Sequence, residues 1–288
     1  MRNLILIFVM CICKNAYTQH QNIELNHQHT RWLDKAINQT NIHSSCKPLM
    51  QSDISFDSLT AKVHKKIGNQ TRKKKFFNYV LRKAFDESFI ILDTTNFKFV
   101  IEPLGNIGFG WENSPDALTK DLQLFGIPLS SVQSHINTRG IRVNSSIGKT
   151  ISFSTAFYEN QSLFPSFVRK YAFSLGQDNY PGSGLVPGQG RAKPSGNEEF
   201  DYGIATAYLN FVPSNRINIR TGHGKHFIGE GYRSILLSDN AFNYPYLRLT
   251  YTLGKKNRFQ YTNLFASLLE NERVPVSNMP EAPFIKKG

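Results

Sequence analysis

One stretch decides the fold class: Leu247-Arg248-Leu249-Thr250-Tyr251-Thr252-Leu253, then Gly254-Lys255-Lys256-Asn257, then Phe259-Gln260-Tyr261. Apolar and polar side chains alternate in it with a period of two, which is the period of a β-strand with one apolar and one polar face. The four residues from Gly254 to Asn257 are of the kind that forms a tight turn. The stretch therefore predicts two antiparallel strands joined as a hairpin.

The same alternation recurs along the chain before this hairpin. It runs through residues 97–112, 141–144, 151–157 and 217–220, and residues 202–211 are expected to form a strand with less distinct faces. With the hairpin, this predicts seven strands before residue 270. In the first strand we expect a bulge at Pro103, where a missing N–H is tolerated.

The connections between these strands alternate in length. Tight turns are expected at 145–148, 213–216 and 254–257, and long connections at about 113–138, 159–201 and 225–243. A soluble antiparallel barrel or sandwich would show the same strand period, but long structureless loops are uncommon in compact soluble domains. Transmembrane barrels have short periplasmic turns and longer outer loops. The expected fold is therefore all-β, an antiparallel transmembrane β-barrel, incomplete in this chain because bacterial single-chain barrels have an even number of strands.

The N-terminus has the features of a secretory signal. A positive end, Met1-Arg2-Asn3, precedes an apolar run at 4–13, and Ala16-Tyr17-Thr18 offers a cleavage site. The run is too short for a membrane helix, which needs about 20 apolar residues. The expected organisation is a signal peptide at 1–18, a polar and helical periplasmic segment at 19–90, and part of an outer-membrane barrel at 91–288.

Within the periplasmic segment, residues 56–87 are expected to be helical. Phe77, Val80, Leu81 and Ala84 have helical spacing beside a basic face. Such a face packs on a neighbouring domain or on a membrane surface, and both alternatives stay open.

The net charge limits the possible binding partners, and the cysteine content limits the possible disulfides. The net charge of +13 favours an anionic partner: nucleic acid, lipopolysaccharide or acidic polysaccharide. Export disfavours nucleic acid. Of the three cysteines, Cys11 and Cys13 leave with the signal peptide, so Cys46 has no partner for an internal disulfide.

Three segments carry a resemblance to a known family: Phe157-Tyr158-Glu159-Asn160-Gln161, Val186-Pro187-Gly188-Gln189-Gly190-Arg191 and the stretch from Gly222 to Pro245. They resemble outer-membrane proteins of Bacteroidota, namely the Wzi-type capsule-assembly barrels and barrels grouped with gliding-motility proteins. The resemblance implies a periplasmic helical bundle followed by a barrel that tethers capsular polysaccharide at the cell surface. It carries over no individual sugar-binding residue.

The candidate polysaccharide-binding residues are basic and aromatic side chains of the long connections. Arginine presents a planar fork to a carboxylate, lysine a point charge, and tyrosine a flat face for a sugar ring. The residues are Arg191, Lys193, Lys225, Tyr232 and Arg233, with Tyr180 and Tyr244 as further stacking faces. The alternative is that they anchor the protein at the lipid and lipopolysaccharide interface.

The sequence gives little indication of a phosphate-binding loop or a metal site. The glycines between Gly222 and Gly231 do not have the spacing of a phosphate loop. Neither the pair His27 and His29 nor the pair His223 and His226 has a third ligand at metal-site spacing, so no metal or other cofactor is expected.

Three functions follow as hypotheses. The first is a non-enzymatic surface barrel that binds capsular or other anionic polysaccharide. The second is an accessory barrel of the gliding or secretion machinery that binds periplasmic envelope proteins. The third is an exported glycoside hydrolase using Glu159, Glu230 or Asp239, but the sequence cannot place two of these carboxylates together, so no catalytic residue is expected.

Overall fold

The structure of the chain is a computed structural model. It describes residues 21–23, 25, 42–53, 89–113, 118, 120–124, 127–174, 184–186, 188–195, 198–273 and 284–287. The expected signal peptide at 1–18 and the expected helix at 56–87 lie outside these residues.

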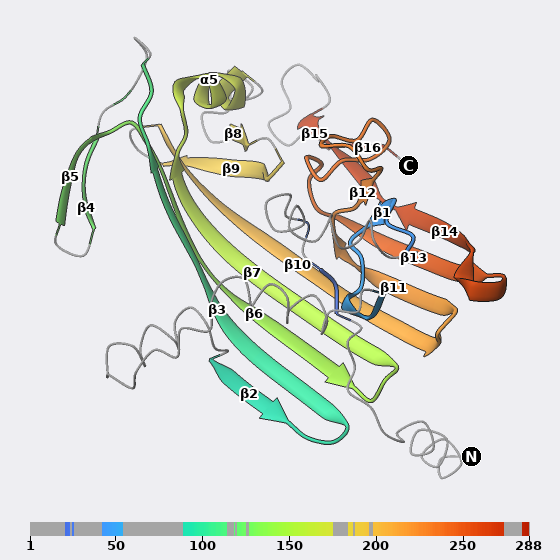
Figure 1. Cartoon of the computed structure of the whole chain (residues 1–288). Coiled ribbons are helices and arrows are strands. Elements are labelled where there is room, and N and C mark those ends of the chain that lie inside the picture. The colour runs from blue at the N-terminus through green and yellow to red at the C-terminus, as the bar shows by residue number, and fades with distance from the viewer. Residues whose placement is uncertain are drawn as a thin grey trace.

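One antiparallel sheet dominates the structure (Figure 1). Eight of its ten strands follow one another from edge to edge: β14 (Phe259–Ala266), β13 (Tyr244–Leu253), β11 (Ile217–Gly224), β10 (Glu199–Ser214), β7 (Ile151–Leu163), β6 (Ser134–Ile147), β3 (Phe97–Gly110) and β2 (Ile90–Asp93). The other two lie off this path: β9 (Gly190–Ser195) pairs with β10, and β8 (Gly184–Val186) pairs with β9. The expected all-β antiparallel architecture is confirmed, and β2 is an edge strand that the sequence pattern did not predict. The described strands at the two edges, β2 and β14, do not pair with each other, so no closed barrel is formed in this part of the chain.

The alternation of tight turns and long connections is confirmed. Tight turns join β6 to β7, β10 to β11, and β13 to β14. The long connections carry small elements: β4 (Lys120–Leu124) and β5 (Ile127–Val132) in the first, α5 (Ser166–Ser174), β8 (Gly184–Val186) and β9 (Gly190–Ser195) in the second, and β12 (Phe227–Ile228) in the third. A hairpin of β15 (Leu268–Arg273) and β16 (Phe284–Lys287) follows β14.

The bulge expected at Pro103 is absent. β3 pairs with β6 in one uninterrupted register, and Pro103 lies opposite Ile141. On the other side of β3, the pairing with β2 reaches only to Ile101. Among the described residues, Pro103 therefore lies beyond the paired length of that edge, where a residue without an N–H costs no ladder hydrogen bond and needs no bulge.

The two faces of the sheet reverse the pattern that is usual in soluble proteins: apolar side chains are exposed on one face, and polar side chains are buried on the other. In β13, Leu247, Leu249 and Tyr251 are exposed, whereas Arg248 and Thr250 are buried. The same inversion runs through β7, β10 and β11, where the buried polar side chains are Ser152, Ser154, Asn160, Ser162, Asn210, Asn218 and Arg220. From β3 to β14 the register places these even-numbered residues on one face, which we call the inner face, and the odd-numbered residues on the outer face.

N-terminal residues cover part of the inner face. The short strand β1 (Cys46–Lys47) pairs with β12, and the 3-10 turn Gln51–Asp53 follows it. The backbone N–H of Asn22 donates to Tyr208 Oη at 3.0 Å. In Figure 1 the blue N-terminal elements lie beside β11, β12 and β13. We call the described residues 21–23, 25 and 42–53 the N-terminal segment.

The second long connection packs on the other end of the inner face. Ala172 of α5, Val186 of β8 and Ala192 of β9 form a small core with Phe200 and Tyr202 of β10. No helix in the described part of the chain is long and apolar enough to cross a membrane.

Candidate functional site

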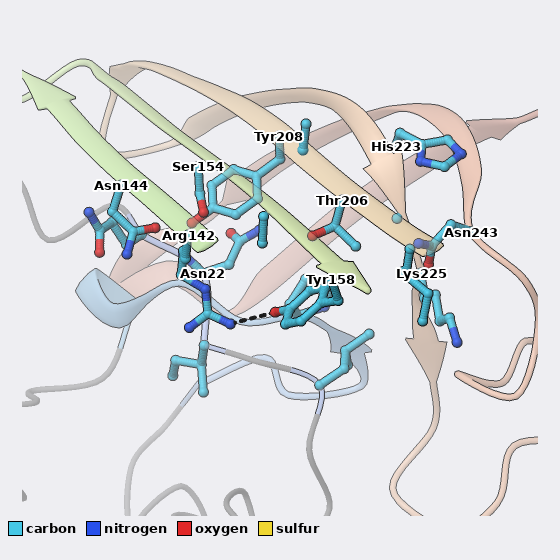
Figure 2. Close-up of a pocket in the computed structure, with 18 of the residues that line it drawn as sticks. Asn22, Arg142, Asn144, Ser154, Tyr158, Thr206, Tyr208, His223, Lys225 and Asn243 are labelled. Carbon is cyan, nitrogen blue, oxygen red and sulfur yellow. Dashed lines mark hydrogen bonds between the residues drawn. The ribbon is translucent and has the colours of Figure 1, made fainter. Parts of the chain in front are cut away.

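A large cavity lies between the inner face and the N-terminal segment (Figure 2). Its volume is about 590 Å³, inside the ~300–1,000 Å³ that small-molecule sites occupy. The polar residues that line it from the strands and from positions next to them include Glu102, Arg142, Asn144, Ser154, Tyr158, Thr206, Tyr208, His223, Lys225 and Asn243. Asn22, Ile23, Pro48 and Gln51 line it from the N-terminal segment.

Arg142 is held by a neighbouring strand. Its Nη2 donates to Tyr158 Oη at 2.9 Å, the bond drawn in Figure 2. Arg142 pairs with Ala156 and Tyr158 pairs with Gly140, so the bond runs diagonally between β6 and β7 along the inner face. On the other side of Arg142, the register places Glu102 of β3 directly opposite it. The wall therefore carries a fixed guanidinium with a carboxylate beside it.

Lys225 follows β11 and supplies a second cation to the cavity. Its Nζ donates to the carbonyl oxygen of Gly188, in the turn between β8 and β9. Burial lowers the pKa of Lys225, and the carboxylate of Asp239 acts in the opposite direction. The bond to Gly188 ties the second long connection to the third beside the cavity.

Amide and hydroxyl groups complete the wall. Asn22 donates its backbone N–H to Tyr208 Oη, and its Oδ1 accepts from Asn210 Nδ2 at 3.4 Å. Asn243 Nδ2 donates to the carbonyl oxygen of Ala205 at 3.0 Å. Such groups both donate and accept hydrogen bonds, which suits a ligand rich in hydroxyl groups.

Of the four predicted binding residues whose side chains the structure describes, Lys193, Lys225, Tyr232 and Arg233, only Lys225 lines this cavity. Arg191 and Lys193 lie on β9, where Lys193 is exposed and pairs with Asp201 of β10. Tyr232 and Arg233 are exposed on the connection after β12. The structure therefore distributes the predicted residues over two long connections and does not gather them into one pocket.

The stacking role predicted for Tyr244 is wrong. Its side chain is buried, and its Oη accepts the backbone N–H of His226 at 3.0 Å. Tyr244 is the first residue of β13 and has inner-face parity, so its ring packs against the His226 ring. Tyr180 lies outside the described residues.

Sequence reasoning missed Arg142, Tyr158 and Tyr208. Their even numbers give them inner-face parity, and this signal was available in the alternating pattern. The pattern does not say which inner-face residues border a cavity, because that depends on where the N-terminal segment packs.

The carboxylates considered for hydrolysis have separate partners. Glu159 accepts from Arg139 at 2.9 Å, Glu230 accepts from Ser44 at 2.7 Å, and Asp239 accepts from Ser238 at 3.2 Å. None of the three carboxylates lines the large cavity. Among the residues that the structure describes, no three His, Cys, Asp or Glu side chains are grouped to hold a metal ion.

Comparisons of the chain with protein-family models, curated proteins and solved structures found no match. The resemblance to Wzi-type barrels therefore rests on the sequence motifs alone.

Proposed function

We propose that the chain is part of a non-enzymatic outer-membrane β-barrel protein that binds acidic, capsule-type polysaccharide. The observation that carries the membrane assignment is the outer face of the sheet. Its exposed apolar side chains are Phe97, Ile107, Ile141, Ile147, Phe157, Leu209, Phe211, Ile217, Leu247, Leu249, Tyr251, Leu253, Phe259, Tyr261 and Phe265.

A lipid environment accounts for this face. A contiguous apolar surface of this kind is unfavourable in water by about 25 cal/mol for each Å² exposed, and in a bilayer this cost disappears. The 14 residues of β3, at ~3.3 Å per residue, are long enough to cross a tilted hydrocarbon core. Transmembrane barrel strands have this alternation of an apolar lipid face and a polar interior.

Both ends of the outer face fit a membrane boundary. Aromatic residues gather where the strands meet the tight turns, namely Phe97, Phe211, Phe259 and Tyr261. Towards the long connections, the exposed ion pair of Arg139 and Glu159 ends the apolar part of β6 and β7. Aromatic girdles and charged rims are typical of the two interfaces of an outer-membrane barrel, with short turns in the periplasm and long loops outside.

The large cavity is the proposed polysaccharide site. Arg142 and Lys225 offer two cations to the carboxylates of an acidic sugar, and the amides and hydroxyls around them suit sugar hydroxyl groups. Arg191, Lys193, Tyr232 and Arg233 lie on the long connections and would contact polymer outside the cavity. This arrangement supports binding without a catalytic step.

Binding of alginate oligosaccharides tests the proposal, with neutral dextran oligosaccharides of equal length as the comparison. The full chain in detergent micelles should bind alginate saturably and more weakly as salt rises. Arg142→Gln and Lys225→Gln should each weaken binding about tenfold, because each removes a charge-assisted hydrogen bond of ~1.4 kcal/mol.

Arg258→Gln is the matched control, since it removes an exposed arginine that does not line the cavity. Tyr158→Phe leaves the guanidinium of Arg142 in place but removes its anchor, and a smaller loss is expected. Equal affinity for alginate and dextran, or equal effects of Arg142→Gln and Arg258→Gln, would contradict the assignment of the cavity.

A further inference from the structure

The large cavity has two walls that come from distant parts of the chain. Asn22, Pro48 and Gln51 line it from the N-terminal segment, and Arg142 and Ser154 are among the residues that line it from the sheet. A ligand in the cavity therefore touches both parts at once. Its binding depends on whether the segment is in place.

The N-terminal segment is attached to the sheet differently from a strand. Its strand β1 pairs with β12 over two residues, and in the described part of the chain it does not join the ten-stranded sheet. The attachment to the sheet instead includes hydrogen bonds to single side chains, such as the bond from the Asn22 N–H to Tyr208 Oη. Elements that lack a long hydrogen-bonded ladder open at lower free energy than the strands of a sheet.

One anchor of the segment lies outside the cavity, on β13. Arg248 donates from Nη1 to the carbonyl oxygen of Pro48 at 3.2 Å and from Nη2 to that of Cys46 at 3.1 Å. Hydrogen bonds from a charged donor are stronger than those between neutral groups. Arg248 does not line the large cavity, so it acts on the cavity through the segment.

A second anchor lies on the third long connection. Glu230 accepts from Ser44 Oγ at 2.7 Å and from Lys47 Nζ at 3.4 Å. The side chain of Glu230 is more than half exposed, and it does not line the large cavity either. Its replacement therefore weakens the attachment of the segment and leaves both the cavity wall and the buried part of the sheet unchanged.

Ser154 reports whether the segment is docked. It lies on β7, pairs directly with Tyr208 of β10, and is only 8% exposed. In Figure 2, Asn22, Ser154 and Tyr208 lie at the same end of the cavity as Arg142. Because Asn22 is bonded to Tyr208, departure of the segment exposes the position of Ser154.

We propose that the N-terminal segment is a movable wall whose docking on the sheet regulates the polysaccharide site. A ligand that touches both walls binds the docked state more tightly, and by linkage it stabilises that state by the same factor. Arg248 and Glu230 are positioning residues, since they act on the site through the segment. The inference rests on the proposed function for the identity of the ligand, whereas the movement of the wall does not depend on it.

The movement is tested without ligand. In a chain whose cysteines are replaced by serine, Ser154→Cys would be reacted in detergent micelles with a charged maleimide. The reaction should be at least fivefold faster when Arg248→Met is added, because the segment then opens more often. Glu230→Ala should accelerate it by a smaller factor, since an exposed ion pair contributes less.

Two controls separate opening of the segment from general unfolding. Lys255→Cys, in the exposed turn between β13 and β14, should react at one rate whichever variant is added. Arg258→Met removes an exposed arginine that does not line the cavity, and it should not change the reaction of Ser154→Cys. Equal reaction rates of Ser154→Cys with and without Arg248→Met and Glu230→Ala would overturn the proposal.

The linkage is tested by hydrogen exchange in the presence of alginate oligosaccharides. If the segment opens only after the ligand leaves, exchange through this opening in peptides that cover residues 45–51 should slow about tenfold at ten times the Kd and about a hundredfold at a hundred times the Kd. Dextran oligosaccharides should have no effect.

The outcomes distinguish this inference from the proposed function. Alginate that binds without slowing this exchange would overturn the regulation and leave the polysaccharide site standing. Absence of alginate binding would overturn the proposed function. In that case faster labelling of Ser154→Cys in Arg248→Met would still support the movable wall.

Discussion

Arg220 and Arg248 donate to the same backbone oxygen, that of Pro48, at 3.0 and 3.2 Å. The two arginines lie on neighbouring strands of the sheet, and Pro48 belongs to the N-terminal segment more than 170 positions earlier in the chain. A carbonyl oxygen has two lone pairs, so it can accept from both guanidiniums at once. This shared acceptor fixes the N-terminal segment on the inner face.

Replacing Arg248 should loosen the N-terminal segment. In Arg248→Met the carbonyl of Cys46 loses its donor and that of Pro48 keeps only Arg220, so we expect a loss of about 1–3 kcal/mol in the stability of this contact. Hydrogen exchange followed by mass spectrometry should show faster exchange in peptides that cover residues 45–51. Arg258→Met should leave these peptides unchanged, and unchanged exchange in Arg248→Met would show that other contacts hold the segment.

Acid should destabilise the fold partly through His226. This residue lies between β11 and β12 and is fully buried (0% exposed). Burial, together with the positive charges of Arg248 and Arg220, lowers its pKa from 6.5 to about 3. The unfolded chain therefore binds a proton between these values that the folded chain does not bind, and stability falls as pH drops through this window by up to about 1.4 kcal/mol per pH unit.

His226→Phe removes the titratable imidazole but keeps an aromatic ring beside Tyr246. In the native chain the ring centroids of His226 and Tyr246 lie 4.3 Å apart. Urea unfolding at several pH values from 7.5 down to 4 should show a smaller acid loss in the variant than in the native chain. Above pH 6.5 the difference between the two chains should be constant. If the unfolding free energies of the two chains fell in parallel over the whole pH range, His226 would not contribute to the acid destabilisation.

Gly190 should tolerate no side chain. Its φ of +89° is rarely adopted by other residues, and an added Cβ would overlap the ring of Phe242. Gly148, in the turn between β6 and β7, has a φ of +54° and open space around it. Gly148→Ala should therefore cost only about 1–2 kcal/mol of backbone strain, and Gly190→Ala should cost more, measured by urea unfolding. Equal losses would show that the loop around Phe242 yields easily.

The strands and tight turns were predictable because they depend on neighbouring residues. A period of two fixes which face each side chain of β13 occupies, and a turn such as Gly254–Asn257 reverses the chain locally. β2 was missed because its four residues, Ile90–Asp93, are apolar or acidic without alternation. The prediction of a bulge at Pro103 was wrong because a proline is tolerated there without a bulge when the neighbouring strand β2 ends before reaching it.

The candidate sites were harder to predict because they depend on distant contacts. Lys225 was found from its charge and its place in a long connection. Arg142 lines the same cavity only because the N-terminal segment packs across from β6 and β7. Arg220 and Arg248 look like ordinary polar positions of two strands, and only the register places them side by side.

The central claim, that the outer face of the sheet meets lipid, is tested most directly on Leu249 and Thr250. They are consecutive in β13, and 36% of Leu249 but only 9% of Thr250 is exposed. In a chain whose cysteines are replaced by serine, a nitroxide spin label would be attached to a single cysteine at each position and the protein reconstituted in lipid vesicles. Oxygen concentrates in the hydrocarbon core, whereas a charged nickel complex stays in water. We expect the label at 249 to collide often with oxygen and rarely with nickel, and the label at 250 to show a lower ratio of oxygen to nickel collisions. A label at 249 that is readily reached by nickel, with no higher ratio than the label at 250, would contradict the account.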